Sequence, residues 1–148
     1  MRTLPRAVTR PLARLVLAGL LLAVLTSCRP MNSSETNLFV ATNNFRKAHG
    51  LPALAQQEPL IDQARSWAAG MASAGALSHS DPHSWNVRWT AVAENVGVSG
   101  SMDDIVQRLE ASPEHAANML STKYTHMAVG TARGKDNRIY AVQLFWRG

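Results

Sequence analysis

The chain has 148 residues, of which 46% are hydrophobic, and a formal net charge of +5 at pH 7. This length and composition predict one domain with its own hydrophobic core, plus an appendage. Four arginines and no acidic residue precede residue 28, so the rest of the chain carries 11 basic residues (15 − 4) against 10 acidic ones. The resulting charge of +1 leaves no basic stripe for nucleic acid, and we expect no nucleic-acid partner.

Residues 1–27 are predicted to be a lipoprotein signal peptide. The arginines precede an apolar run over 15–25, which is too short for a transmembrane helix and typical of a secretory signal. The segment closes with Leu25-Thr26-Ser27-Cys28, which resembles the site where bacterial lipoproteins are cleaved and acylated. Cys28 is the only cysteine, so a disulfide framework is excluded. We expect export and acylation of Cys28, for example with palmitate; an ordinary signal peptide with an incidental cysteine is the alternative.

A short tether and the first helix follow. Residues 28–35 are predicted to form the lipidated tether and residues 36–148 the folded domain. Apolar residues recur at helical spacing over 38–48, which predicts a helix with Ser33 or Ser34 as its N-cap.

Three more helices and a strand are expected next. An apolar stripe predicts a helix over 59–74, and β-branched residues predict an extended segment over 90–98. Ser101 begins a sequence typical of a capping box, which predicts a third helix. Ser112 suits the N-cap of a fourth helix, where its hydroxyl can accept a backbone N–H, and Pro113 suits the first helical position.

Two strands complete the chain, over 124–132 and 138–146, joined by a turn at 134–137. The last strand is apolar on both faces, so it should be central in the sheet and covered on both sides. The element order predicts an α+β fold, a three-layer α-β-α sandwich with a small, mostly antiparallel central sheet.

Chemistry could be carried by His79, Glu94 and His115, which lie in three different segments. His115 is in the first turn of the fourth helix, where the positive end of the helix dipole disfavours the charged imidazolium. Two imidazoles and one carboxylate suit three ligands of Zn²⁺ or a similar divalent cation, with water as the fourth. They equally suit a metal-free acid–base group. A histidine that only packs or caps remains the structural alternative.

A serine nucleophile is a competing hypothesis. Ser78 and Ser80 flank His79, and Ser112 lies in the helix start described above. None of them lies in a Gly-x-Ser-x-Gly elbow, which weakens this hypothesis.

Several segments carry short motifs in a characteristic order: Asn43 to Leu54, the helix around Leu60 to Met71, Leu77-Ser78-His79, Ala93-Glu94-Asn95-Val96, Ser112 to Leu120, Tyr124 to Gly130, and Tyr140 to Phe145. Over about residues 36–146 this order resembles the CAP superfamily, also called SCP-like. Its members include cysteine-rich secretory proteins, antigen 5 and pathogenesis-related proteins. The resemblance implies an α-β-α sandwich with a surface cleft that carries two histidines and one or two glutamates. In some members this cleft binds a divalent cation.

By this resemblance, His79, Glu94 and His115 occupy the positions of the cleft residues. Glu110 or Glu114 would be the fourth ligand, although neither aligns securely with the family's second glutamate.

The chain departs from the family pattern at three positions. Ala93 replaces a glycine before the cleft glutamate, Glu114 replaces a glycine before His115, and Leu109 stands where a tryptophan is common. Glu114 could partner a cation or block the cleft. Its carboxylate would also raise the pKa of His115, against the effect of the helix end.

These observations predict an exported, membrane-anchored lipoprotein on the outer face of the bacterial cell membrane. Its cleft would bind a ligand, which could be a lipid, a peptide or part of the cell wall, with or without a divalent cation. The alternative is a peptidase or cell-wall hydrolase in which His79 and His115 hold a metal-activated water and Glu94 orients it or accepts the proton. A structural envelope protein with a vestigial site is a third reading. We expect a monomer.

Overall fold

The computed structural model describes residues 30–148. Cys28 and the predicted signal peptide lie outside the described residues. In chain order the elements are α1 (Ser33–Ala48), β1 (Ala55–Gln56), α2 (Glu58–Ala74), the 3₁₀ turn η1 (Pro82–Ser84), β2 (Ala91–Ser99), α3 (Met102–Ala111), α4 (Pro113–Leu120), β3 (His126–Arg133) and β4 (Ile139–Arg147). In this described part, no helix is both long and apolar enough to span a membrane.

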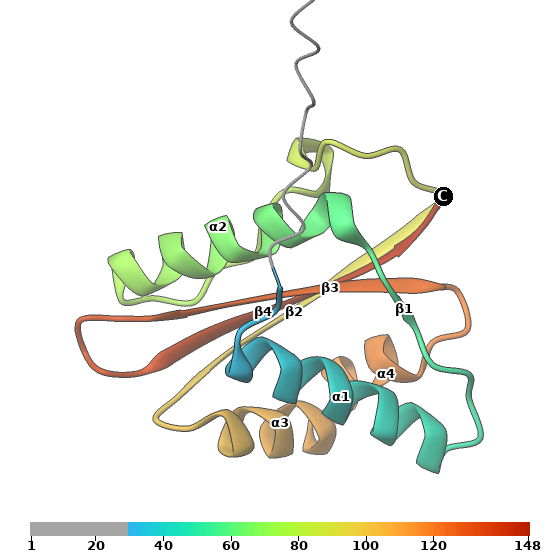
Figure 1. Cartoon of the computed structure of the whole chain (residues 1–148), viewed down its shortest axis with the longest axis horizontal. Coiled ribbons are helices and arrows are strands. Elements are labelled where there is room, and N and C mark those ends of the chain that lie inside the picture. The colour runs from blue at the N-terminus through green and yellow to red at the C-terminus, as the bar shows by residue number, and fades with distance from the viewer. Residues whose placement is uncertain (1–29) are drawn as a thin grey trace, which may run out of the picture.

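The elements form three layers, with the sheet in the middle (Figure 1). One hydrophobic cluster joins α2 to one face of the sheet, and a second joins α1, α3 and α4 to the other face. The strand order is β1-β3-β4-β2, where β1 pairs with β3 in parallel and the other pairs are antiparallel. The predicted α+β fold, an α-β-α sandwich with a mostly antiparallel sheet, is therefore confirmed. β1 and the 3₁₀ turn η1 were not predicted, because two or three residues are too few to show a periodic pattern.

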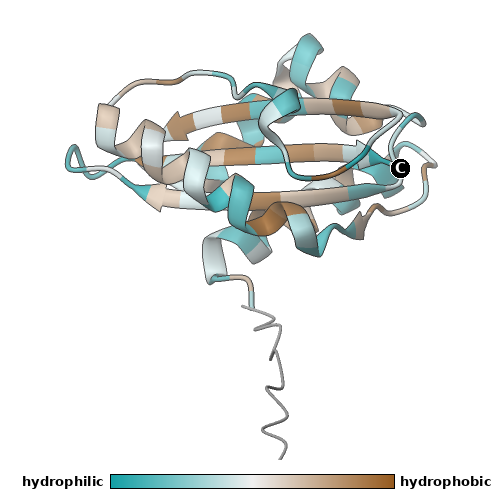
Figure 2. Ribbon diagram, turned by 90° about the horizontal axis from the view of Figure 1, so that it is seen from above, coloured by the Kyte–Doolittle hydropathy of each residue, from teal (hydrophilic) through white to brown (hydrophobic). Residues whose placement is uncertain are grey.

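β4 is an inner strand, and residues 139–145 are all buried. Its side chains alternate between the two cores. One face carries Ile139, Ala141 and Phe145, and the other carries Tyr140, Val142 and Leu144. Figure 2 shows hydrophobic residues along the long strands of the sheet. The prediction that this strand is covered on both sides is confirmed.

The start of α1 differs from the prediction. Its N-cap is Asn32, not Ser33 or Ser34. The Asn32 side chain accepts from the backbone N–H of Glu35, and the Glu35 carboxylate accepts from the backbone N–H of Asn32. This reciprocal capping box satisfies two otherwise unpaired donors, which decides where the helix begins. The end of the segment predicted as a tether, residues 28–35, is thus helical.

The caps of α3 and α4 also differ in part. Ser101 accepts from the N–H of Asp104, as predicted, but the Asp104 carboxylate turns to the hydroxyl of Ser99 instead of completing a capping box. α4 begins at Pro113 as predicted, but the Ser112 side chain makes no capping bond, so that part of the prediction is wrong. Ser112 is also the C-cap of α3. Its backbone therefore has to end one helix and begin the next.

Gly130 allows α2 to lie directly on β3. A Cβ atom at residue 130 would be 2.2 Å from the carbonyl carbon of Ala64 and 2.3 Å from the nitrogen of Arg65. Only glycine fits such a close approach of two backbones. This contact sets the distance of α2, and of the loop that follows it, from the sheet.

Candidate functional site

His79, in the loop after α2, and Glu94, on the edge strand β2, form a hydrogen-bonded pair. Nδ1 of His79 lies 2.7 Å from Oε1 of Glu94. The His79 side chain is 63% exposed and the Glu94 side chain 6%, so a buried carboxylate is joined to an imidazole that solvent reaches. Because a carboxylate only accepts hydrogen bonds, the proton between them lies on Nδ1. Nε2 of a neutral ring is then left as an acceptor.

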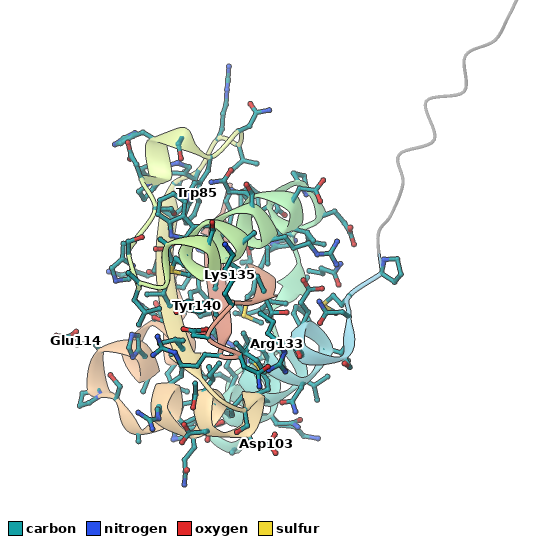
Figure 3. The ribbon with its side chains drawn as sticks, turned by 90° about the vertical axis from the view of Figure 1, so that its left-hand side faces the viewer. Trp85, Asp103, Glu114, Arg133, Lys135 and Tyr140 are labelled. Atoms are coloured by element: carbon teal, nitrogen blue, oxygen red, sulfur yellow. The ribbon has the colours of Figure 1, made fainter. Side chains whose placement is uncertain are left out.

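Ser80 holds the Glu94 carboxylate from a second side. Its backbone N–H donates to Oε1 at 2.9 Å, and its hydroxyl donates to Oε2 at 2.6 Å. The same hydroxyl accepts from Nε1 of Trp85 at 2.9 Å, and Trp85 is buried in the hydrophobic cluster that includes α2 (Figure 3). The Ser80 hydroxyl is bonded on both sides, so it positions Glu94. The competing hypothesis of a serine nucleophile gains no support at this residue.

His115 is half-buried on α4. Burial lowers its pKa, the charge of nearby His79 lowers it further, and Glu114 raises it. The pKa is lowered overall, so His115 favours the neutral form at neutral pH. The direction of this shift agrees with the prediction, but its first cause is burial and not the helix dipole. Glu114 is exposed and extends outward from α4 (Figure 3).

The alternation of β2 explains how these residues are arranged. Successive side chains of a strand point to opposite faces of the sheet. The Glu94 carboxylate meets His79 and Ser80, which follow α2, whereas the Asn95 amide donates to the backbone carbonyl of His115 at 3.1 Å. The two predicted histidines thus approach the edge strand from its two faces.

The predicted ligands do not form a metal-binding group. Among residues 30–148, no three His, Cys, Asp or Glu side chains lie where they could hold one ion. Both Glu94 oxygens already accept hydrogen bonds. Glu110, a predicted fourth ligand, lines a separate hollow between α1 and α3.

A chain of hydrogen-bonded polar side chains, three amides and one hydroxyl, lies behind the site and was not predicted from the sequence. Thr42 of α1 accepts from Gln143 of β4, Gln143 accepts from Asn95, and Asn95 accepts from Asn118 of α4. The O···N distances are 2.6, 2.9 and 2.9 Å in this order. Polar residues inside otherwise apolar strands could have indicated this network, because polar side chains are buried only when they have hydrogen-bond partners.

Asn43 and Arg46, which lie near the end of α1 in the motif segment from Asn43 to Leu54, have a structural role. Arg46 is 1% exposed, and its guanidinium donates to the carbonyls of Pro52, Met119 and Ser121. Asn43 exchanges two hydrogen bonds with the backbone of Leu54. Burial lowers the pKa of Arg46, but the side chain stays charged at any ordinary pH. These contacts attach the loop after α1 and the end of α4 to the domain.

Comparison with known proteins agrees with this architecture. The model of the CAP family, described as the cysteine-rich secretory protein family, matches residues 39–145. An outer surface protein from Borrelia burgdorferi superposes with a TM-score of 0.72 at 17% identity, over 80% of this chain and 96% of that protein. An extracellular protein with an SCP domain from Bacillus anthracis gives 0.69 at 22% identity, over 81% of this chain and 45% of that protein.

A cysteine-rich secretory protein from Staphylococcus aureus gives a TM-score of 0.66 at 20% identity, over 81% of this chain and 41% of that protein. Curated protein sequences give no match. At these identities the solved structures establish the fold, while the family model covers more than half of the chain. The order of the motifs, the sandwich and the family match agree, and the chain belongs to the CAP family of cysteine-rich secretory proteins.

Proposed function

We propose that this protein is an exported CAP-domain lipoprotein, anchored through Cys28 on the outer face of a bacterial membrane, that binds a ligand at the His79–Glu94 pair. The basic and apolar N-terminal segment supports export. Two structural neighbours are described as an outer surface protein and an extracellular protein. The observation that carries the binding function is the buried carboxylate that orients an exposed imidazole.

The ligand is expected to meet Nε2 of His79. Since Nδ1 donates to Glu94, Nε2 accepts a hydrogen bond from a hydroxyl or amide of the ligand. Glu94, Ser80 and Trp85 hold the ring before a ligand arrives, which reduces the entropy lost on binding. Sugars of the cell wall and peptides offer such donors.

Binding at the pair is tested with insoluble cell-wall peptidoglycan. His79→Ala should abolish co-sedimentation of the purified full chain with the polymer. His83→Ala is the matched control, because His83 is an exposed histidine of η1 that makes no hydrogen bond to Glu94. Equal binding by both variants would contradict a role of the pair.

A hydrolase is the second candidate, and the same pair supports it. An imidazole held by a buried carboxylate is the arrangement of a general base, with Glu94 stabilising the imidazolium that forms on His79. Soluble fragments would then be released from peptidoglycan or from peptides, and Glu94→Gln should stop the release. If the polymer is bound but stays intact, the protein is a binding module.

A divalent cation remains a prediction for this site, and no step of the proposed chemistry depends on it. Zinc titration followed by calorimetry is the direct test. A stoichiometric heat that disappears in both His79→Ala and His115→Ala would support a metal site. Unspecific uptake that is equal in the wild type and both variants would reject it.

The anchor has a separate test. Cys28→Ser should move the protein from the membrane fraction to the soluble fraction, because the lipid supplies the attachment. Unchanged membrane retention of this variant would contradict lipidation at Cys28.

A further inference from the structure

We propose that the domain is held at the membrane in one orientation, with the His79–Glu94 pair turned away from the bilayer. This inference rests on the proposed anchor at Cys28. It deepens the proposed function, because it assigns the ligand to the space beyond the anchoring membrane instead of to the lipids of that membrane.

The first observation is a set of contacts that fixes the chain where it enters the domain. The Arg65 guanidinium of α2 donates to both carboxylate oxygens of Glu35, at 2.8 and 2.7 Å. It also donates to the backbone carbonyl of Pro30 at 2.9 Å. The Asn32 amide lies 3.3 Å from the hydroxyl of Thr131 in β3. We call Arg65, Glu35 and the Pro30 carbonyl the entry clamp.

The ion pair of the entry clamp is largely shielded from solvent. The Glu35 side chain is 1% exposed and the Arg65 side chain 20%. Burial by itself would raise the pKa of Glu35, but the hydrogen bonds from Arg65 and Asn32 lower it overall. The pair therefore stays charged on both sides at neutral pH, and separating it would leave a buried charge without a partner. Residues 30–35 consequently move with the domain.

The second observation is the length of chain left between lipid and clamp. From Cys28 to Pro30 there are two residue steps, and an extended chain spans about 3.3–3.6 Å per step, or roughly 7 Å. A domain of this size has a radius of gyration of about 13 Å, so it is much wider than its free tether is long. The domain cannot turn over on such a tether.

The third observation is where the candidate site lies relative to the clamp. Asn32, next to the entry clamp, contacts the sheet at Thr131 in β3, whereas Glu94 lies in β2, with β4 between the two strands. Two strand spacings are about 10 Å. Figure 3 shows the chain entering on one side of the molecule and Glu114, next to His115, on the opposite side. The side of entry faces the membrane, so the site faces away from it.

The test measures how close two labelled residues lie to the membrane surface, with the processed protein acylated at Cys28 in vesicles of phosphatidylglycerol and phosphatidylethanolamine that carry a headgroup quencher. Acylated Cys28 has no free thiol, so a fluorophore attaches only to an introduced cysteine. One is placed by Asp62→Cys, one turn from Arg65 on α2, and one by Glu114→Cys on α4; both residues are exposed. We expect at least threefold stronger quenching at residue 62 than at residue 114.

A flexible insertion between Arg29 and Pro30 releases the constraint and leaves the folded domain unchanged. With about 12 Gly and Ser residues, which reach roughly 20 Å on average, the quenching ratio should fall to about one. Arg65→Ala should lower it in the same direction, whereas Arg108→Ala, which removes the exposed ion pair with Asp104 of α3, should leave it at threefold or more.

Two failures are distinguishable. If the protein does not sediment with the vesicles and Cys28 reacts with the fluorophore, the proposed anchor is wrong. If the protein is anchored but residues 62 and 114 are quenched equally, or residue 114 more strongly, the fixed orientation is overturned. A ratio that the insertion does not change would overturn it as well.

Discussion

Asn95→Ala should strongly destabilise the domain, because Asn95 is the centre of the chain of hydrogen-bonded polar side chains. Asn95 is 0% exposed. Its amide donates to Oε1 of Gln143 at 2.9 Å and to the carbonyl of His115 at 3.1 Å, and its oxygen accepts from Asn118 at 2.9 Å. Alanine removes all three bonds and leaves their partners in place.

The magnitude follows from the burial of these partners. Leaving a buried polar group unsatisfied costs about 1–3 kcal/mol. Gln143 is 0% exposed and has no access to water, whereas Asn118 and His115 are half-buried and can recover part of the loss. We therefore expect a loss of about 3 kcal/mol, a large share of the roughly 5–15 kcal/mol that stabilises a typical domain.

Urea unfolding followed by tryptophan fluorescence measures this loss. Asn44→Ala is the matched control: Asn44 is exposed on α1, so the change should stay within about 0.5 kcal/mol. In the double variant Asn95→Ala/Gln143→Leu the loss should be smaller than the sum of the single losses, because the unpaired amide is removed. A loss below about 1 kcal/mol for Asn95→Ala would refute the reasoning.

Four further predictions concern His115, the packing of α2 on β3, and the β3–β4 turn. NMR titration should show a His115 pKa below its ordinary value. His79→Ala should raise this pKa, because the positive charge of His79 disfavours the imidazolium, and Glu114→Gln should lower it further, because the negative charge of Glu114 stabilises the imidazolium. Shifts of the pKa in the opposite directions would contradict these assignments. Folding lowers the pKa of His115, so the unfolded chain binds more protons than the folded one at pH values between the folded and unfolded pKa. The stability due to His115 is therefore present above the unfolded pKa and is lost as pH falls through the folded pKa. His115→Gln should flatten this part of the pH dependence of urea unfolding. Gly130→Ala should cost at least about 3 kcal/mol, because the added Cβ meets the backbone of α2, and a cost below about 1 kcal/mol would disprove the close approach. The pKa of Asp136 is lowered to about 2, first by the hydrogen bond from the backbone N–H of Arg138 and then by that from Tyr140. Asp136 should therefore stabilise the β3–β4 turn above the unfolded pKa of an aspartate, and this stabilisation should be lost as pH falls towards 2. Asp136→Asn should remove this pH dependence in acid titrations followed by circular dichroism.

The long elements were predictable because their apolar residues repeat with the helical or strand period. α2 and β4 agree with their predicted ranges to within two residues, and α4 begins at the predicted Pro113. The two-residue β1 was not predictable, since its parallel pairing with His126 and Met127 depends on a distant segment. The N-cap of α1 was mistaken because several polar residues precede the helix, and Asn32 is selected by its reciprocal bonds with Glu35.

The sequence suggested which residue types could form the candidate site, but not how their side chains are arranged. His79 and Glu94 were selected for their chemistry, and the structure brings them into contact. Ser80 was weighed as a nucleophile, whereas its bonds to Glu94 and Trp85 give it a positioning role. Sequence spacing cannot reveal such a role, because it depends on the packing of Trp85 in the hydrophobic cluster that includes α2.

By itself the sequence determined the layers, the inner position of β4, the choice of histidines and glutamate, and the hypothesis of a lipid anchor. These follow from local periodicity, residue chemistry and motif order, all of which can be read along the chain. The tertiary structure decided which of these residues meet. Glu94 and Asn95 are neighbours in sequence, yet one holds His79 and the other holds the backbone of His115. Successive side chains of a strand point to opposite faces of the sheet, so Glu94 and Asn95 meet different layers. Only the folded sheet shows which residues lie on each face.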